Sequence, residues 1–156
     1  MVSPGCTNCY AQRMAAQFRR RSRQHLDLES ERSARENQKI QAAGSDLKLC
    51  VTEFGWPTAE GLKGKLRDGF GFVSDNTAQD QATFIDQALT EMQQGGYVRL
   101  AFLFNMHYGI LANWQLDGPT GDNVPWSIMG PNWQPRPIWQ KIVDRNFRGQ
   151  PRKASQ

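Results

Sequence analysis

Residues 47–57 read Leu-Lys-Leu-Cys-Val-Thr-Glu-Phe-Gly-Trp-Pro, and this stretch decides the expected fold. Its apolar, β-branched and aromatic residues predict a buried strand, which Gly55 and Pro57 bring to an end. Glu53 is the last charged residue of that strand. In α/β proteins the carboxyl end of a strand is where chemistry is done, because the strand fixes the side chain and the following loop shapes a pocket. Glu53 is therefore the first candidate for a functional carboxylate, the plainer alternative being a strand-end carboxylate paired with an Arg.

A helix and a second strand follow this first strand. After a long Gly-rich loop, Asn76 or Thr77 is expected to cap a helix, with Asp80 completing the cap. Gly95 and the glycine after it end the helix. Residues 97–106 are an almost continuous apolar run, which predicts a strand buried on both faces, as in a parallel sheet. The apolar stripe expected to pack this helix into the core consists of Ala78, Ala82, Ile85, Leu89 and Met92.

The segment Thr-Glu-Phe-Gly-Trp at 52–56, the helix start near residue 76 and the run Ala-Phe-Leu-Phe-Asn at 101–105 occur in an order that resembles a known family. They are similar to the end of a retaining β-glycosidase of the large (β/α)8-barrel clan that includes cellulases and β-xylosidases. The resemblance implies an α/β fold, with residues 45–147 forming the last two β/α units of a partial TIM barrel. Its closing segment would be a last helix from Pro137 to about Asp144.

The resemblance also implies roles for individual residues. Glu53 would be the catalytic nucleophile, and the end of the second strand would offer an aromatic ring on which a sugar stacks. Phe104 stands where a Trp is frequent in the clan, so other aromatic residues are alternatives for this platform. The implied partner is a β-linked oligo- or polysaccharide, and no cofactor is implied. The candidate substrate-binding residues are Trp56, Phe104, Asn105, Tyr108 and Trp114.

A retaining glycosidase needs two carboxylates about 5 to 5.5 Å apart, one as nucleophile and one as acid/base. In the clan the acid/base Glu lies on the fourth barrel strand, which the resemblance does not cover. Glu60, Asp68 and Asp75 are poor substitutes, because a general acid must be held firmly and these residues lie on a long loop. The chain has 156 residues, whereas a complete barrel has about 250. We therefore expect a glycosidase fragment that is incomplete as an enzyme, completed by an oligomer or by a missing barrel segment.

Residues 1–44 are expected to form a basic, largely helical or disordered arm. Cys6 and Cys9 form a CxxC pair, and residues 3–14 resemble the start of a phage-associated, radical-SAM-like family. Two thiolates are half of a zinc or iron–sulfur site, and no further Cys/His pair at metal spacing follows. The prediction is that no metal binds, with a metal or iron–sulfur protein as the alternative.

Overall composition restricts the partners. The net charge is +4, and the excess of Arg lies before the central strand, so it describes a solvated arm, and nucleic-acid binding is not expected. No apolar run approaches the roughly 20 residues of a membrane span. The sequence starts without a secretory signal pattern, the clan is often extracellular, and the localisation is left unassigned. Residues 148–156 are polar and predicted to be disordered.

A third interpretation is a carbohydrate-binding remnant without catalytic activity. It is motivated by Trp56, Trp114 and Trp126, because the C–H face of a sugar lies flat on an aromatic ring. Each of these Trp residues can instead pack the core.

Overall fold

The computed structural model describes residues 33–118 and 120–145. A helix covers 33–42, followed by strand β1 (Leu49–Phe54), helix α3 (Ala78–Gly95), strand β2 (Val98–Leu103) and helix α4 (Pro137–Asp144). The two strands pair in parallel. The described chain is thus a mixture of helix and strand with a two-stranded parallel sheet, in agreement with the α/β class. The predictions for Cys6, Cys9 and the tail 148–156 lie outside the described residues.

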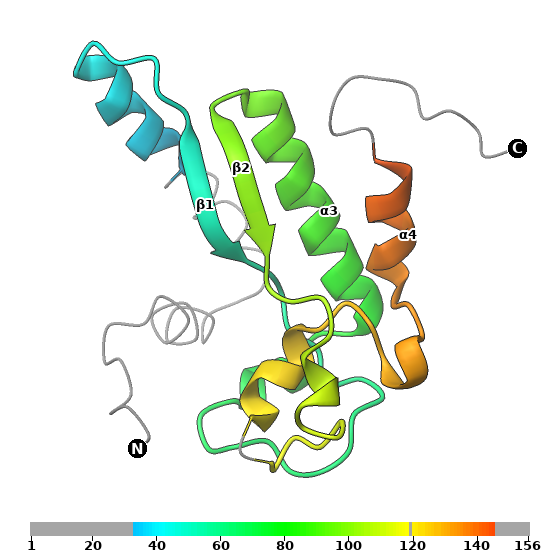
Figure 1. Ribbon diagram of the computed structural model, residues 1–156. Coiled ribbons are helices and arrows are strands. Elements are labelled where there is room, and N and C mark those ends of the chain that lie inside the picture. The colour runs from blue at the N-terminus through cyan, green and yellow to red at the C-terminus, as the bar shows by residue number, and fades with distance from the viewer. Residues whose placement is uncertain (1–32, 119, 146–156) are drawn as a thin grey trace, which may run out of the picture.

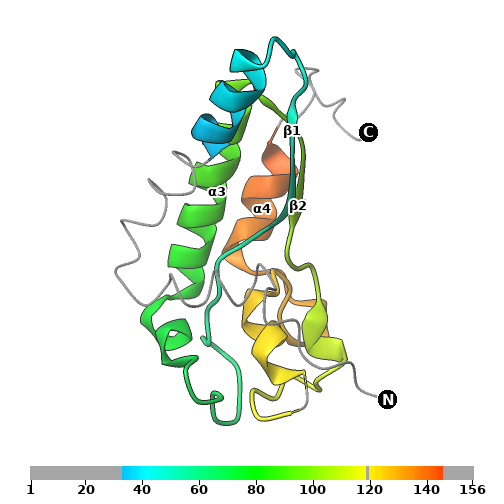
Figure 2. The ribbon, with the colours of Figure 1, turned by 90° about the vertical axis from the view of Figure 1, so that its left-hand side faces the viewer.

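Helices α3 and α4 lie on the same side of the sheet (Figure 1). The view turned by 90° makes this plain, since both helices stand to the left of the strands (Figure 2). The two helices are also packed against each other. The arrangement is therefore two layers, with the sheet as one layer and the helices as the other.

Local chemistry accounts for the limits of α3. The Thr77 hydroxyl accepts a hydrogen bond from the Asp80 backbone N–H at 3.0 Å, and the Asp80 carboxylate accepts one from the Thr77 N–H at 2.9 Å. This is the predicted capping box, which satisfies two of the free N–H groups at the start of the helix. The Thr77 hydroxyl also donates to the Asp80 carboxylate at 2.7 Å, and this hydrogen bond together with the one from the Thr77 N–H lowers the pKa of Asp80. Gly96 closes the helix with φ of 66°, a left-handed conformation that glycine adopts without strain.

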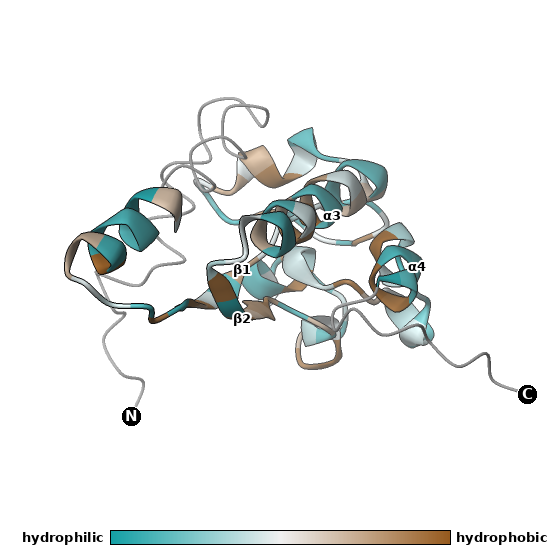
Figure 3. Ribbon diagram, turned by 90° about the horizontal axis from the view of Figure 1, so that it is seen from above, coloured by the Kyte–Doolittle hydropathy of each residue, from teal (hydrophilic) through white to brown (hydrophobic). Residues whose placement is uncertain are grey.

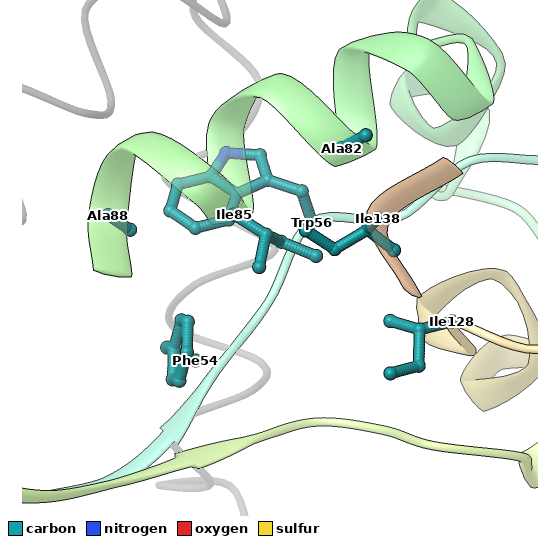
Figure 4. Packing of buried hydrophobic residues seen from close by; sticks show 7 residues of the cluster. All are labelled: Phe54, Trp56, Ala82, Ile85, Ala88, Ile128 and Ile138. Carbon is teal, nitrogen blue, oxygen red and sulfur yellow. The ribbon is translucent and has the colours of Figure 1, made fainter. Parts of the chain in front are cut away.

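The core lies between the sheet and the helices. Ile85 of α3 and Ile138 of α4 are fully buried there, together with Phe54 from the end of β1 (Figure 4). Figure 3 colours stretches of both strands and of α4 brown, whereas α3 is largely teal and white, so α3 contributes only one narrow apolar stripe. The predicted stripe is confirmed in its centre: Ala82 and Ile85 are buried, and Leu89 and Met92 pack against the cluster.

The prediction that the strands are buried on both faces is wrong for β2. Leu100 and Phe102 are 49% and 52% exposed. On β1, Cys50 and Thr52 are exposed as well. The physical reason is the layer order: both helices cover one face of a sheet of only two strands, so the described residues leave the other face uncovered.

The register of the two strands contains an irregularity at the carboxyl end of β1. Val51 pairs with Ala101 and Phe54 pairs with Leu103, so two residues of β1 stand where β2 has only Phe102. An extra residue of this kind is a β-bulge, which is rare in parallel pairs and commonly re-aims a side chain near a functional site. The two residues within this bulge are Thr52 and Glu53.

Ionic contacts join α3 to the end of α4. The carboxylate of Asp86 accepts hydrogen bonds from Arg145 and, at 3.0 Å, from Lys141. Burial acts to raise the pKa of Asp86, but the hydrogen bonds and charges of Arg145 and Lys141 outweigh it, so the pKa is lowered overall. The contacts therefore stabilise the folded chain only while Asp86 is ionised.

We predict a pH dependence from Asp86. Because its pKa in the folded state lies below its ordinary value of 3.8, its contribution is present above about pH 4 and is lost as the pH falls through the folded-state value. Asp86→Asn should lower the free energy of unfolding by about 1 kcal/mol at pH 7 and change it little at pH 2. Urea unfolding of both proteins at the two pH values measures this. Equal differences at both pH values would contradict it.

Candidate functional site

The candidate site lies at the carboxyl ends of β1 and β2. Both strands point toward the same end of the molecule, and the loops that follow them gather there (Figure 1). Glu53 is partly buried at this end, inside the β-bulge. Within the described residues its carboxylate has no hydrogen bond or ion pair, so the alternative of a structural pair with an Arg finds no partner there.

The two strand ends are joined directly beside Glu53. The N–H of Phe104 donates to the carbonyl oxygen of Phe54 at 2.7 Å. Gly55 follows, and its backbone lies against the carbonyl of Phe104. The peptide bond between Phe104 and Asn105 is cis. The Phe104 ring lies 6.2 Å, centroid to centroid, from the ring of Tyr108. These two predicted residues are thus brought together at the end of β2.

The Asn105 side chain makes several hydrogen bonds within the chain. Its side-chain N–H donates to the carbonyl of Asn123 at 3.0 Å, and its side-chain oxygen accepts from the Ser127 hydroxyl at 2.9 Å and from the Tyr108 N–H at 3.0 Å. Asn105 is only 9% exposed. Its amide is therefore occupied in holding the loop after β2 against the segment around Ser127, and it positions Tyr108.

Trp56 is a core residue in this fold. It is 3% exposed, and its ring centroid lies 6.2 Å from that of Phe84 on α3. Figure 4 shows it among the buried side chains between the strand and α3. Trp126 is buried too. Neither ring offers an open face to a sugar, so of the Trp residues proposed for carbohydrate binding Trp114 is left.

Trp114 belongs to an aromatic cluster that the sequence did not reveal. The ring of His107 stacks on Trp133 with centroids 3.9 Å apart and an interplanar angle of 22°. The same imidazole is nearly perpendicular to the ring of Trp114, with centroids 5.0 Å apart at 88°. The sequence contains a weak signal for this cluster, because Asn113-Trp114 and Asn132-Trp133 are two Asn-Trp pairs. In the structure all four residues have φ between 46° and 59°. Asn tolerates this left-handed conformation better than most residues.

A buried polar network fixes the start of α3 to the loops of the site. The fully buried Gln81 donates to the carbonyl of Trp56 at 2.8 Å, and Arg136 donates to Gln81 and to the carbonyl of Pro125, both at 3.4 Å. Burial lowers the pKa of Arg136 to about 10, and the charge of Glu60 acts in the opposite direction. Because buried polar groups cost free energy unless paired, this network constrains where the loops lie.

The acidic residues of the loop after β1 are either hydrogen-bonded to the backbone or exposed. The carboxylate of Glu60 accepts a hydrogen bond from the N–H of Ala78 at 2.7 Å, so it caps α3. Asp68 and Asp75 are exposed. This agrees with the expectation that these loop acids are poor substitutes for the acid/base group.

Within residues 33–118 and 120–145, no three His, Cys, Asp or Glu side chains converge as a metal ion requires. The free thiol in this part of the chain, Cys50, is exposed. None of the described helices has the length and hydropathy needed to cross a membrane.

Comparisons of the chain with protein-family models, curated proteins and solved structures found no match. The function is therefore argued from the chain's own residues.

Proposed function

We propose that this chain supplies the nucleophile side of a retaining β-glycosidase site, with Glu53 as the attacking carboxylate. The observation that carries the proposal is the position of Glu53: a partly buried carboxylate, without a pairing partner among residues 33–118 and 120–145, in a bulge at the carboxyl end of a parallel strand. The order strand, helix, strand, helix also agrees with the last two β/α units of a (β/α)8 barrel. In such a barrel the strands have helices on one face and the barrel interior on the other.

The uncovered face of the sheet supports the same proposal. Leu100 and Phe102 are apolar and half exposed, and they alternate along β2 with Ala101 and Leu103, which pack against the core. Strands of a closed barrel carry apolar residues on both faces, because the interior is filled by side chains. The pattern on β2 is the one expected of a strand whose second face is designed to be covered by further barrel strands.

The chemistry follows from the placement of the carboxylate. One oxygen of Glu53 attacks the anomeric carbon, the C–O bond to the leaving group breaks, and the leaving oxygen takes the bonding electron pair. A glycosyl ester on Glu53 results. With a natural alcohol as leaving group the step needs a proton from an acid, but a dinitrophenolate leaves without one. Water releases the sugar from the ester in a second step that needs a general base.

This scheme predicts a stoichiometric burst. With a 2,4-dinitrophenyl β-glycoside the purified chain should release about one equivalent of dinitrophenolate per chain and then nearly stop, because none of the acids on the described loop after β1 is held as a base that could hydrolyse the ester. Absorbance at short times measures the burst, with β-glucoside, β-xyloside and α-glucoside compared. The α-glucoside is the control and should give no burst. Equal release from both anomers, or no release from either β-glycoside, would contradict the proposal.

A further inference from the structure

One indole ring at the candidate site is held firmly and left open on one face. Trp133 is 55% exposed, although its ring stacks on His107. At 3.9 Å and 22° the imidazole covers one face of the indole. The exposed area therefore includes the other face. A Trp that served only the core would be covered on both faces, as Trp56 is.

The ring of His107, which stacks on Trp133, is also held by a second indole. Trp114 contacts His107 at a nearly perpendicular angle, and the Trp114 ring in turn lies directly against the backbone of Gly109. A Cβ added at Gly109 would fall 2.4 Å from Trp114, so only glycine permits this approach. The three rings thus form a cluster in which His107 lies between the two indoles, and Trp114 is packed against the backbone. Such bracing reduces the conformational entropy that Trp133 would lose when a ligand packs on it.

The backbone that presents Trp133 is unusual. Asn132 and Trp133 have φ of 55° and 59°, a region that bulky residues rarely adopt. The turn is closed by a hydrogen bond of 2.6 Å from the Gly130 N–H to the carbonyl of Gln134 and by a bridge between Met129 and Pro135. Conformations of this kind cost on the order of 1 kcal/mol or more and gather at functional sites. Here the conformation keeps the large apolar ring of Trp133 exposed to solvent.

His107 contributes a ring and no polar contact. Neither imidazole nitrogen has a hydrogen-bond partner among the described residues, although both atoms are buried. A buried polar atom without a partner is uncommon and calls for an explanation. Among the described residues, the ring contacts of His107 are its stack on Trp133 and its perpendicular contact with Trp114.

We propose that the open face of Trp133 is a stacking platform for a pyranose ring of a β-linked oligosaccharide, at a position beyond the sugar attacked by Glu53. The apolar C–H face of such a ring lies flat on an indole, and Asn132 and Gln134, the exposed chain neighbours of Trp133, carry amide groups suited to sugar hydroxyls. The inference rests on the proposed function, since it extends that site along the same glycan.

The connection between the platform and Glu53 is short. Phe54, next to Glu53, is hydrogen-bonded to Phe104, and His107 is three residues further along. Steps of 3.8 Å along the chain and about 5 Å between strands put the Cα atoms of Glu53 and His107 within about 20 Å of each other. An oligosaccharide of several units is long enough to reach across a separation of this size.

Titration calorimetry with cellohexaose and with xylohexaose tests the platform. The Glu53→Gln protein serves as the background, so that no ester forms. Adding Trp133→Ala should weaken binding of the better ligand about tenfold, whereas Trp133→Phe and His107→Phe should each stay within about threefold, because both retain a stacked aromatic pair. Near-ultraviolet circular dichroism checks that each variant is folded; Trp133 is exposed, so its replacement leaves the core intact.

The outcomes separate this inference from the proposed function. If the dinitrophenyl β-glycoside gives its burst but Trp133→Ala binds the hexasaccharides as tightly as the background protein, the platform is refuted and the nucleophile stands. If Trp133→Ala weakens hexasaccharide binding and there is no burst, the platform stands without catalysis. Binding of neither hexasaccharide by the background protein overturns the platform. A glucose or xylose monomer that competes as well as the hexasaccharide also overturns it.

Discussion

Replacing Glu53 with Gln is expected to abolish the burst of dinitrophenolate from activated β-glycosides. The amide keeps the shape of the side chain and removes the charge that attacks the anomeric carbon, so the rate of the first step should fall on the order of a thousandfold or more. Because Glu53 has no ion pair among the described residues, its replacement removes no stabilising contact of the described fold. The melting temperature should therefore change by no more than about 2 °C.

A matched control separates the nucleophile from general electrostatics. Asp75→Asn removes one negative charge from an exposed residue at the end of the loop that follows β1. Its burst should stay within about twofold of the wild-type value. In the Glu53→Ala protein, azide fills the space left by the carboxylate, attacks the same face of the sugar and yields the α-glycosyl azide. A burst that survives in Glu53→Gln, or a β-glycosyl azide from Glu53→Ala, would contradict the assigned role.

Replacing Gly55 with Ala is expected to disrupt the site through the backbone. A Cβ at residue 55 would lie 2.2 Å from the carbonyl oxygen of Phe104 and 3.3 Å from its carbonyl carbon. These atoms cannot move aside without disturbing the hydrogen bond from the Phe104 N–H to Phe54. We expect a loss of about 3 kcal/mol or more in the free energy of unfolding, at the upper end for an overpacked site.

The control for this substitution is Gly71→Ala. A Cβ at residue 71 meets no atom within 4 Å, and the backbone there is not in the left-handed region. Its effect on stability should be within about 0.5 kcal/mol. Urea unfolding followed by Trp fluorescence measures both variants, and the burst assay reports whether Gly55→Ala also loses the site. Similar stabilities for the two variants would show that the junction between β1 and β2 tolerates a side chain at residue 55.

Elements with local signals were predictable from the sequence. The capping residues Thr77 and Asp80 mark the start of α3, and the two glycines after Gln94 mark its end. The alternation and turn residues around Glu53 likewise located β1. These features depend on residues within a few positions of one another in the chain, so local sequence patterns are enough to predict them.

Features that join distant residues were not predictable. The stack of His107 on Trp133 connects positions 26 residues apart, and the network of Gln81 and Arg136 connects positions 55 residues apart. The β-bulge at Glu53 depends on the register against β2, which no local pattern fixes. Trp56 was expected near the sugar because of its motif, but its burial follows from how the chain turns onto α3 after Gly55.

The burial of Trp56 and the exposure of Trp133 change which residues form the proposed sugar-contacting surface. Of the aromatic residues that the resemblance implies for sugar binding, Trp56 lies in the core. Phe104 and Tyr108 lie together at the end of β2. The open indole is instead Trp133, which comes from the segment before α4. Carbohydrate contacts would thus come from the two segments that converge after β2.

Mass spectrometry of the chain after reaction with a 2,4-dinitrophenyl 2-deoxy-2-fluoro-β-glycoside tests the assignment of Glu53 most directly. The fluorine slows hydrolysis of the ester, so the adduct should persist through digestion and peptide sequencing. The expected result is a single fluoroglycosyl group on Glu53, present in the wild-type chain and absent from Glu53→Gln. No adduct, or an adduct on another carboxylate that forms equally in Glu53→Gln, would contradict the proposal that Glu53 is the nucleophile.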